Sequence, residues 1–184
     1  MGEENKKALE QQLWNIANEL RGKMDADEFR DYILGFIFYK YLSEKIENFT
    51  NELLKEDGIT FTSLDSNNPE HEEILNSLKD DCVQQLGYFL KPNELFSAMA
   101  KKGNSDNNNF ILDDLTQVLR HIESSTMGTE SEDDFEHLFE DLDLTSTKLG
   151  RTEEAKNKLI AKVLYHLDNI NFELKNHDRD VLGD

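Results

Sequence analysis

The sequence predicts a compact all-α fold of several helices, with at most a small extended hairpin. Apolar residues recur every three or four positions through most of the 184 residues, which is the spacing of one helix face. Helix-start and helix-stop residues separate these periodic stretches. A chain of this length forms one domain that buries roughly 70% of its unfolded surface, so we expect the helices to share one core.

The first two predicted helices span residues 6–21 and run from residue 26 toward residue 55. The first has one apolar face, formed by Leu9, Leu13, Ile16, Ala17 and Leu20. The second is apolar on nearly every side, through Phe29, Tyr32, Ile33, Leu34, Phe36, Ile37, Phe38, Tyr39, Tyr41 and Leu42. Such a helix is covered by other helices or spans a membrane, and this one is too short for a bilayer. We therefore expect a buried central helix.

The junction between these two helices carries both a stop and a start signal. Gly22 can end the first helix, because glycine enters the left-handed region without steric cost. Asp25 occupies the N-cap position of the second helix, with Glu28 three residues later as in a capping box. Met24 and Phe29 stand where a hydrophobic staple would close around that cap. This turn is expected to fix the angle between the helices.

The middle of the chain alternates breaks with apolar stripes. Gly58 ends the second helix, and the alternation within residues 59–64 predicts a short extended piece. Residues 67–69, Asn-Asn-Pro, start a third helix, whose apolar stripe is Ile74, Leu75, Leu78 and Leu86. Pro92 or Asn93 starts a short fourth helix that contains Leu95, Phe96 and Met99.

Two polar loops and three more helices are predicted in the rest of the chain. Residues 103–109 and residues 124–131 are the loops, since Gly, Ser, Asp and Asn favour turns. Between them lies a fifth helix with buried positions Leu112, Leu115, Val118, Leu119 and Ile122. Ser131 with Asp134 resembles a capping box that opens a short acidic helix through Phe135, Leu138 and Phe139. Thr152 caps the last long helix, whose buried positions are Leu159, Ile160, Val163, Leu164 and Leu167.

The net charge of −19 is distributed unevenly along the chain. Residues 48–143 hold twenty-two acidic and six basic side chains, and this segment should repel DNA because Lys and Arg supply most of the affinity for phosphate. Residues 144–184 hold seven of each sign. The candidate contacts with DNA or a partner are five of these seven basic side chains: Lys148, Arg151, Lys156, Lys158 and Lys162. An ordinary solvated helix face paired with Glu153 and Glu154 is the favoured alternative.

Three blocks of residues resemble the methylation (M) subunit of type I restriction-modification systems, in the order of that family. In residues 13–45, Leu-Trp-x-x-Ala-x-x-Leu-Arg precedes a Tyr/Phe-rich helix that ends in Lys-Tyr-Leu-Ser-Glu-Lys. In residues 139–152, an acidic-aromatic stretch precedes Thr-Lys-Leu-Gly-Arg-Thr. The third and weakest block is residues 86–96, with Leu-Gly-Tyr-Phe, a proline and Leu-Phe.

This resemblance implies a non-catalytic, helical N-terminal domain over residues 1–170, with residues 171–184 starting a linker into a catalytic domain. The full-length protein would be a site-specific DNA adenine methyltransferase that uses S-adenosylmethionine. Two M subunits would join one specificity (S) subunit, and a restriction (R) subunit would add cleavage. The helical domain would serve assembly of this complex and its closure around double-stranded DNA.

The residues themselves indicate no catalytic, cofactor-binding or metal site in this segment. An adenine methyltransferase needs a glycine-rich turn for S-adenosylmethionine and an (Asn/Asp)-Pro-Pro-(Phe/Tyr) loop for the flipped base. The chain has no Gly-x-Gly, and residues 68–70 are Asn-Pro-Glu. Its five histidines lack metal-site spacing, and Cys82 has no cysteine partner for zinc. A calcium loop starting at Asp141 would require glycine and glutamate where the chain has Ser146 and Thr152.

Two other functions fit parts of the sequence. An acidic DNA mimic, such as an anti-restriction protein, would use the acidic segment 48–143, although the strongly apolar helix pair exceeds what a charge mimic requires. A generic helical protein-interaction module is the other alternative. Trp14 and the aromatic residues of the second helix also suggest base stacking, but at helical spacing such residues are more often core. Any exposed members of this set would suit docking to another protein.

The sequence predicts a cytoplasmic protein with no membrane partner. Its first residues are polar and offer no secretory signal, and it has no apolar stretch that is long enough to span a bilayer. Cys82 is the single cysteine, so an internal disulfide is impossible and a reducing compartment fits.

The charge distribution predicts weak DNA binding by residues 1–184 alone. We expect a dissociation constant no tighter than ordinary non-specific binding, about 10⁻⁴ M at physiological salt. A fluorescence anisotropy titration of labelled duplex DNA measures this constant. A salt-sensitive micromolar complex would contradict the prediction.

Overall fold

The predicted all-α class is confirmed in the part of the chain that the structure describes. The computed structural model describes residues 2–20, 25–104, 111–125, 139 and 142–170. These residues form six α-helices and four short 3-10 helices, and they contain no strand. None of the helices in these ranges has the length and apolar character needed to cross a bilayer.

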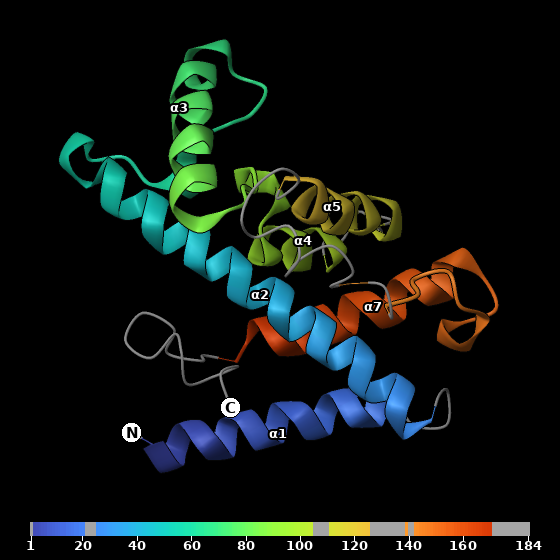
Figure 1. Ribbon diagram of the computed structural model, residues 1–184. Helices are drawn as coiled ribbons and strands as arrows, with labels where there is room; N and C mark the ends of the chain where they lie inside the picture. The colour runs from blue at the N-terminus through green and yellow to red at the C-terminus, as the bar shows by residue number, and fades with distance from the viewer. Residues whose placement is uncertain (1, 21–24, 105–110, 126–138, 140–141, 171–184) are drawn as a thin grey trace.

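Two crossing helices organise the molecule. The long α2 (Ala26–Leu54) runs diagonally through it, with α3 (Pro69–Leu86) at its far end (Figure 1). α7 (Glu153–Asp168) crosses α2 and lies between α1 (Gly2–Leu20) and α4 (Phe96–Gly103). α5 (Leu112–Ser125) packs beside α4 and against α7. Each of the five interior positions predicted for α7 is buried.

One face of α2 forms the centre of the core. Phe36 and Tyr39 are fully buried there, and the Tyr39 ring packs edge-on against Phe96 of α4 with 5.3 Å between ring centroids. The Tyr39 hydroxyl donates a hydrogen bond of 2.5 Å to the carbonyl of Glu94. The Tyr88 hydroxyl likewise donates to the carbonyl of Leu42 at 2.7 Å. Each buried hydroxyl therefore has an acceptor, which avoids the cost of an unpaired polar group.

The prediction that α2 is covered on nearly every side is only partly right. Phe38 and Tyr41 are half-buried, and Leu34 is 51% exposed. Trp14 of α1, expected more often in the core, is 61% exposed. The periodic pattern identified both helices correctly, but it counts apolar residues without showing how many neighbouring helices are available to cover them.

The start and end of α2 follow from local signals, as predicted. The Asp25 carboxylate accepts a hydrogen bond of 2.9 Å from the backbone N–H of Glu28, which lowers the pKa of Asp25. Gly58 has φ of 69° and follows the 3-10 helix η1 (Lys55–Asp57) that ends α2. The predicted stop at Gly22 and the staple side chains of Met24 and Phe29 lie outside the described residues.

The extended piece predicted for residues 59–64 is wrong. Phe61–Ser63 form the 3-10 helix η2, in which Phe61 is fully buried and packs edge-on against Phe89. The Asn51 side chain of α2 accepts a hydrogen bond of 2.7 Å from the N–H of Phe61. A bond from the preceding helix, ten residues earlier, and a ring contact with Phe89 accompany this conformation, and the alternating pattern does not reveal either.

The predicted third and fifth helices are confirmed, and the fourth begins later than expected. Asn68 caps α3, with Pro69 in its first turn. The five apolar positions predicted for α5 are all buried. Pro92–Glu94 form the 3-10 helix η3, and α4 starts only at Phe96. The acidic helix predicted after Ser131 falls on residues that the structure does not describe, apart from Phe139, which is buried.

Two helices begin at side chains that come from elsewhere in the chain. Asn157 of α7 is buried, and its side-chain oxygen Oδ1 accepts hydrogen bonds from the backbone N–H groups of Ile111 (2.7 Å) and Leu112 (3.0 Å), where α5 begins. Its side-chain nitrogen Nδ2 donates to the backbone carbonyl of Glu153 at 2.7 Å. The Ser43 hydroxyl of α2 accepts from the N–H of Phe96 at the start of α4 (2.9 Å). These contacts satisfy backbone groups that have no partner within their own helix.

Replacing Phe36 tests whether the buried face of α2 stabilises the domain. Phe36→Ala should lower the free energy of unfolding by about 3–5 kcal/mol, because it leaves a cavity in the core. Leu53→Ala is the matched control on the same helix, since Leu53 is 45% exposed, and it should change stability far less. Chemical denaturation of residues 1–184 measures both, and equal effects would contradict the assignment.

A second pair of variants tests the cap that α7 provides for α5. Asn157→Leu removes the acceptor and leaves two buried N–H groups unpaired, at about 1–3 kcal/mol for each. Asn157→Asp loses the donor to Glu153 and buries a carboxylate, but it keeps an acceptor for both N–H groups, so it should retain more of the stability than Asn157→Leu. Denaturation curves compare the two, and an equal loss would show that the cap is not what stabilises this junction.

Candidate partner and DNA interface

The turn between residues 142 and 152 is held tightly against the first half of α2. Leu142 packs so closely on Gly35 that a Cβ there would lie 2.5 Å from the Leu142 side chain. The Tyr32 hydroxyl donates to the carbonyl of Asp143, and Lys148 pairs with Glu28. The positions of the turn and of its basic side chains are therefore fixed relative to α2.

Hydrogen bonds and ion pairs within this region shift several pKa values. The Asp143 carboxylate accepts from the hydroxyl (2.7 Å) and the N–H (2.9 Å) of Thr145, and these bonds lower the pKa of Asp143. The hydrogen bond to Glu28 raises the pKa of Lys148. Burial raises the pKa of Tyr32 to about 12. At neutral pH the carboxylate and the ammonium are therefore charged, and the phenol is neutral.

The structure separates the five basic candidate residues into different environments. Lys156 is buried, and its ammonium donates to the carbonyl of Thr145 at 3.0 Å and lies 3.4 Å from Glu153. Lys148 pairs with Glu28, and Lys158 with Glu154 at 3.2 Å. Arg151 and Lys162 are exposed. Lys156 thus connects α7 to the preceding turn, while the other four side chains lie on the surface.

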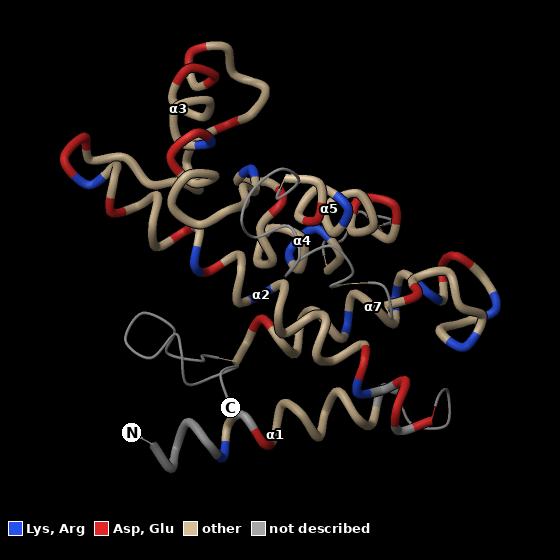
Figure 2. Tube along the Cα trace, viewed as in Figure 1, with Lys and Arg blue, Asp and Glu red and all other residues tan. Residues whose placement is uncertain are grey.

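Charges of the two signs lie on different parts of the described surface. Acidic residues predominate on α3 and at the adjoining end of α2, whereas basic residues gather near the turn that precedes α7 (Figure 2). Lys148, Arg151, Lys158 and Lys162 belong to this second region, which we call the basic edge.

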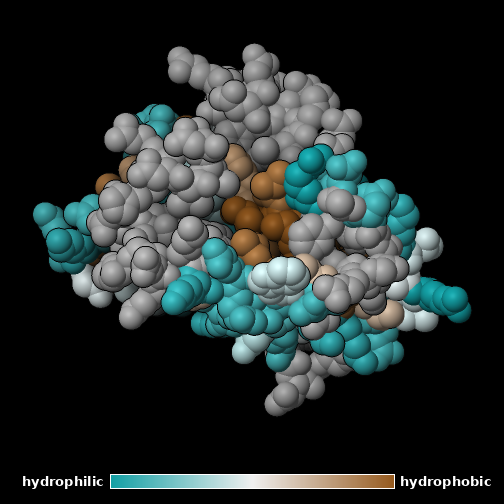
Figure 3. Space-filling view, turned by 90° about the horizontal axis from the view of Figure 1, so that it is seen from below, coloured by the Kyte–Doolittle hydropathy of each residue, from teal (hydrophilic) through white to brown (hydrophobic). Residues whose placement is uncertain are grey.

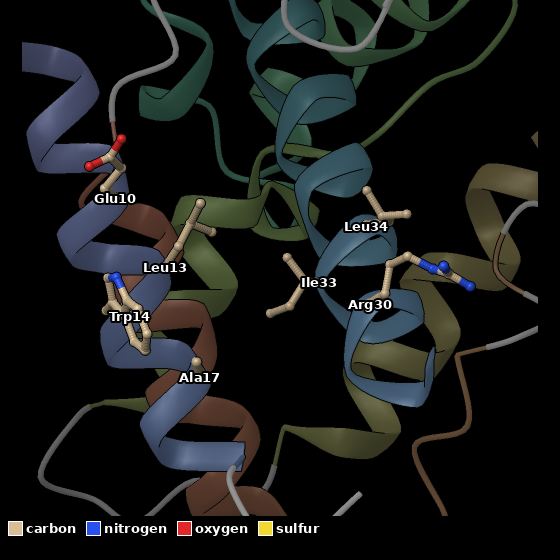
Figure 4. Close-up of a pocket in the computed structure, with 7 residues that line it drawn as sticks. All are labelled: Glu10, Leu13, Trp14, Ala17, Arg30, Ile33 and Leu34. Atoms are coloured by element: carbon tan, nitrogen blue, oxygen red, sulfur yellow. The ribbon is translucent and has the colours of Figure 1, made fainter. Parts of the chain in front are cut away.

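A second surface feature is an apolar groove of about 430 Å³ between α1 and the first half of α2. Leu13 and Ile33 point toward one another across it, from α1 and α2 respectively (Figure 4). Trp14 and Ala17 continue the α1 wall, and Leu34 continues the α2 wall. Its two charged residues are Glu10 and Arg30. On the side of the molecule that carries α1, apolar side chains are visible at the bottom of a hollow (Figure 3).

The clustering and burial of metal-ligating and nucleophilic side chains bear on the chemistry open to the described part of the chain. The described residues contain no cluster of three or more His, Cys, Asp or Glu side chains that could hold a metal ion. Cys82 is buried, and desolvation raises its pKa to about 12, so its thiol is a poor nucleophile. Methyltransferases bind S-adenosylmethionine at a glycine-rich turn. The sequence has no Gly-x-Gly and the walls of the groove are mainly apolar, so this groove does not fit S-adenosylmethionine.

Residues 9–167 match the family described as the HsdM N-terminal domain, a range that includes all of α2, α3, α4 and α5 and most of α1 and α7. The chain belongs to this family. The resemblance to type I M subunits that the sequence motifs indicated is therefore confirmed.

Two relatives show how the chain compares with longer proteins. The methylase subunit of the type I restriction enzyme MpnII from Mycoplasma pneumoniae is 29% identical over 188 residues, which cover 98% of this chain and 34% of that protein. The crystal structure of a type I restriction-modification methyltransferase subunit from Streptococcus thermophilus matches with a TM-score of 0.74 and 35% identity, over 96% of this chain and 36% of that one. The chain spans about a third of the length of both relatives.

The sequence could not reveal three of the residues that shape these surfaces. Trp14 and Leu34 read as core residues because their spacing is helical, and only the distance between α1 and α2 leaves them exposed. The sequence pattern predicts that Lys156 belongs to a charged helix face. It does not show that the Lys156 ammonium donates to Thr145, because Thr145 lies in the turn before α7. The capping residues Asn157 and Ser43 are equally hidden, since their partners are about fifty residues away in the chain.

Proposed function

We propose that this chain is the N-terminal helical domain of a type I restriction-modification M subunit, and that its role is assembly and closure of the methyltransferase complex around DNA. The observation that carries the proposal is the match of nearly the whole chain to about a third of two methyltransferase subunits. Family membership favours this function over an acidic DNA mimic or a generic interaction module. The domain would occupy residues 1–170, followed by a linker at residues 171–184.

In this proposal, the chemistry belongs to the part of the subunit that follows residue 184. That part would bind S-adenosylmethionine and transfer its methyl group to the exocyclic amino group of adenine. The partners would be an S subunit, which selects the target sequence, a second M subunit, and an R subunit in the complete restriction complex. The complex would act on double-stranded DNA in the cytoplasm.

The basic edge is the part of this domain that we assign to the DNA. Arg151 is exposed, and no described acidic residue forms an ion pair with it. Lys158 and Lys162 are four residues apart and lie on one side of α7, and Arg151 lies in the turn just before the Thr152 cap. An exposed pair such as Lys158–Glu154 contributes little stability, so it can give way to phosphate. The large acidic surface on α3 would face away from the duplex.

Charge reversal on the basic edge tests this assignment in the assembled complex of M and S subunits. Arg151→Glu combined with Lys158→Glu should weaken DNA binding and lower the slope of log K against log salt by about one for each phosphate that no longer has a cationic partner. Lys55→Glu is the control, since Lys55 is exposed at the opposite end of α2. Lys148 is left intact because reversing it would break its pair with Glu28.

Two measurements report the result of this experiment. Anisotropy titrations at several salt concentrations give the slope, and transfer of a labelled methyl group from S-adenosylmethionine to target DNA gives the activity. An unchanged slope in the double variant would show that the basic edge is an ordinary solvated face. Absence of methyl transfer by the unmodified complex would contradict the proposed function itself.

A further inference from the structure

The groove between α1 and α2 is an unpartnered apolar surface with a regular geometry. Its α1 wall is formed by Glu10, Leu13, Trp14 and Ala17, which repeat at the spacing of one helix stripe. Its α2 wall is formed by Arg30, Ile33 and Leu34 at the same spacing. Two helix stripes that face a common groove are the setting in which a third helix packs, with its own ridge of side chains between them.

The exposed apolar residues of the domain are concentrated at this groove. Among residues whose burial is described, four large apolar side chains are exposed, and two of them, Trp14 and Leu34, line it. Single exposed apolar residues are ordinary, but their clustering on a concave surface marks an interaction site. α1 packs mainly on α7 and touches α2 little, so nothing within the described residues closes the groove.

We propose that this groove holds an amphipathic helix from the later part of the same M subunit, which follows residue 184. This inference rests on the proposed function, in which the chain is one domain of a longer polypeptide. The relatives contain about twice as much chain again outside the matched region, which is ample to supply such a helix. Its apolar stripe would cover Trp14 and Leu34, and a basic side chain at one end would face Glu10.

The path of the chain favours an intramolecular occupant over a separate protein. α7 is the last described helix, and it runs beside α1 in the opposite direction (Figure 1). The end of α7, where the described residues stop, therefore lies on the side that carries α1. A segment joined to this end by a linker has a higher effective concentration at the groove than a separate protein, so a modest apolar contact is sufficient to keep it there.

Site-specific photo-crosslinking in the full-length M subunit tests the proposal. A photoreactive amino acid replaces Trp14 in one protein, Leu34 in a second, and Leu53 in a control, because Leu53 is an exposed residue at the other end of α2. Positions 14 and 34 should both crosslink within the same chain, to one common segment after residue 184. Position 53 should not reach that segment.

A substitution then tests whether the apolar contact holds the segment in place. Leu34→Asp should reduce the crosslink from position 14 by about tenfold or more, because a carboxylate without a partner opposes burial. Leu53→Asp should leave it unchanged. Both substitutions are at exposed positions, and thermal melts of the two variants show whether the domain remains folded.

Three outcomes would overturn the proposal: crosslinks from positions 14 and 34 to a second M subunit, crosslinks to the S subunit, or no crosslink at all. Mixing isotope-labelled and unlabelled subunits separates links within one chain from links between copies. Methyl transfer by the unmodified complex is measured in parallel. An active complex without the intramolecular crosslink would reject the groove assignment alone, whereas an inactive complex would reject the proposed function.

Discussion

The aromatic face of α2 is the constraint on which the rest of the structure depends. Phe36 and Tyr39 remove more apolar surface from water than one neighbouring helix can cover, so α4, α7 and the turn after residue 142 all approach this face. The tyrosine hydroxyls add a directional requirement, because a buried O–H needs an acceptor. Tyr39 finds one at Glu94 and Tyr32 at Asp143, in segments 55 and 111 residues away. Burial brings these segments together, and the hydrogen bonds set their positions.

The two crossing helices also supply the polar contacts that let shorter elements form. The Ser43 side chain of α2 accepts a hydrogen bond from the first N–H group of α4, and the Asn51 side chain accepts one from the first N–H group of η2. The Asn157 side chain of α7 does the same where α5 begins. A short helix gains little from its own hydrogen bonds, because nucleation is unfavourable. α4 and η2 therefore depend on the helices that cap them. The consequence is a cooperative domain whose surfaces keep fixed relative positions.

The functional surfaces lie where this internal packing ends. The basic edge surrounds a turn that Gly35, Tyr32 and Glu28 hold against α2, so its charges have defined positions instead of belonging to a free loop. The apolar groove lies beside the same half of α2, where α1 packs on α7 and leaves Leu34 uncovered. One half of α2 thus supports both the basic edge, which we propose contacts DNA, and the apolar groove, which we propose holds a helix. This arrangement fits the proposed role of the domain in closing a complex around DNA.

The sequence by itself determined the all-α class, the family and most helix boundaries. Those features depend on local information: the caps at Asp25, Asn68 and Thr152 act within three residues, and apolar periodicity needs only one helix. Tertiary structure alone decided that Phe61 lies in a 3-10 helix, that Lys156 is buried while the other four basic candidate residues are exposed, and that Trp14 faces a groove. Each of these outcomes depends on a group from a distant segment, or on the space that distant segments leave. A single sequence shows what a residue can contact, but the packing of helices far apart in the chain decides which of those contacts forms.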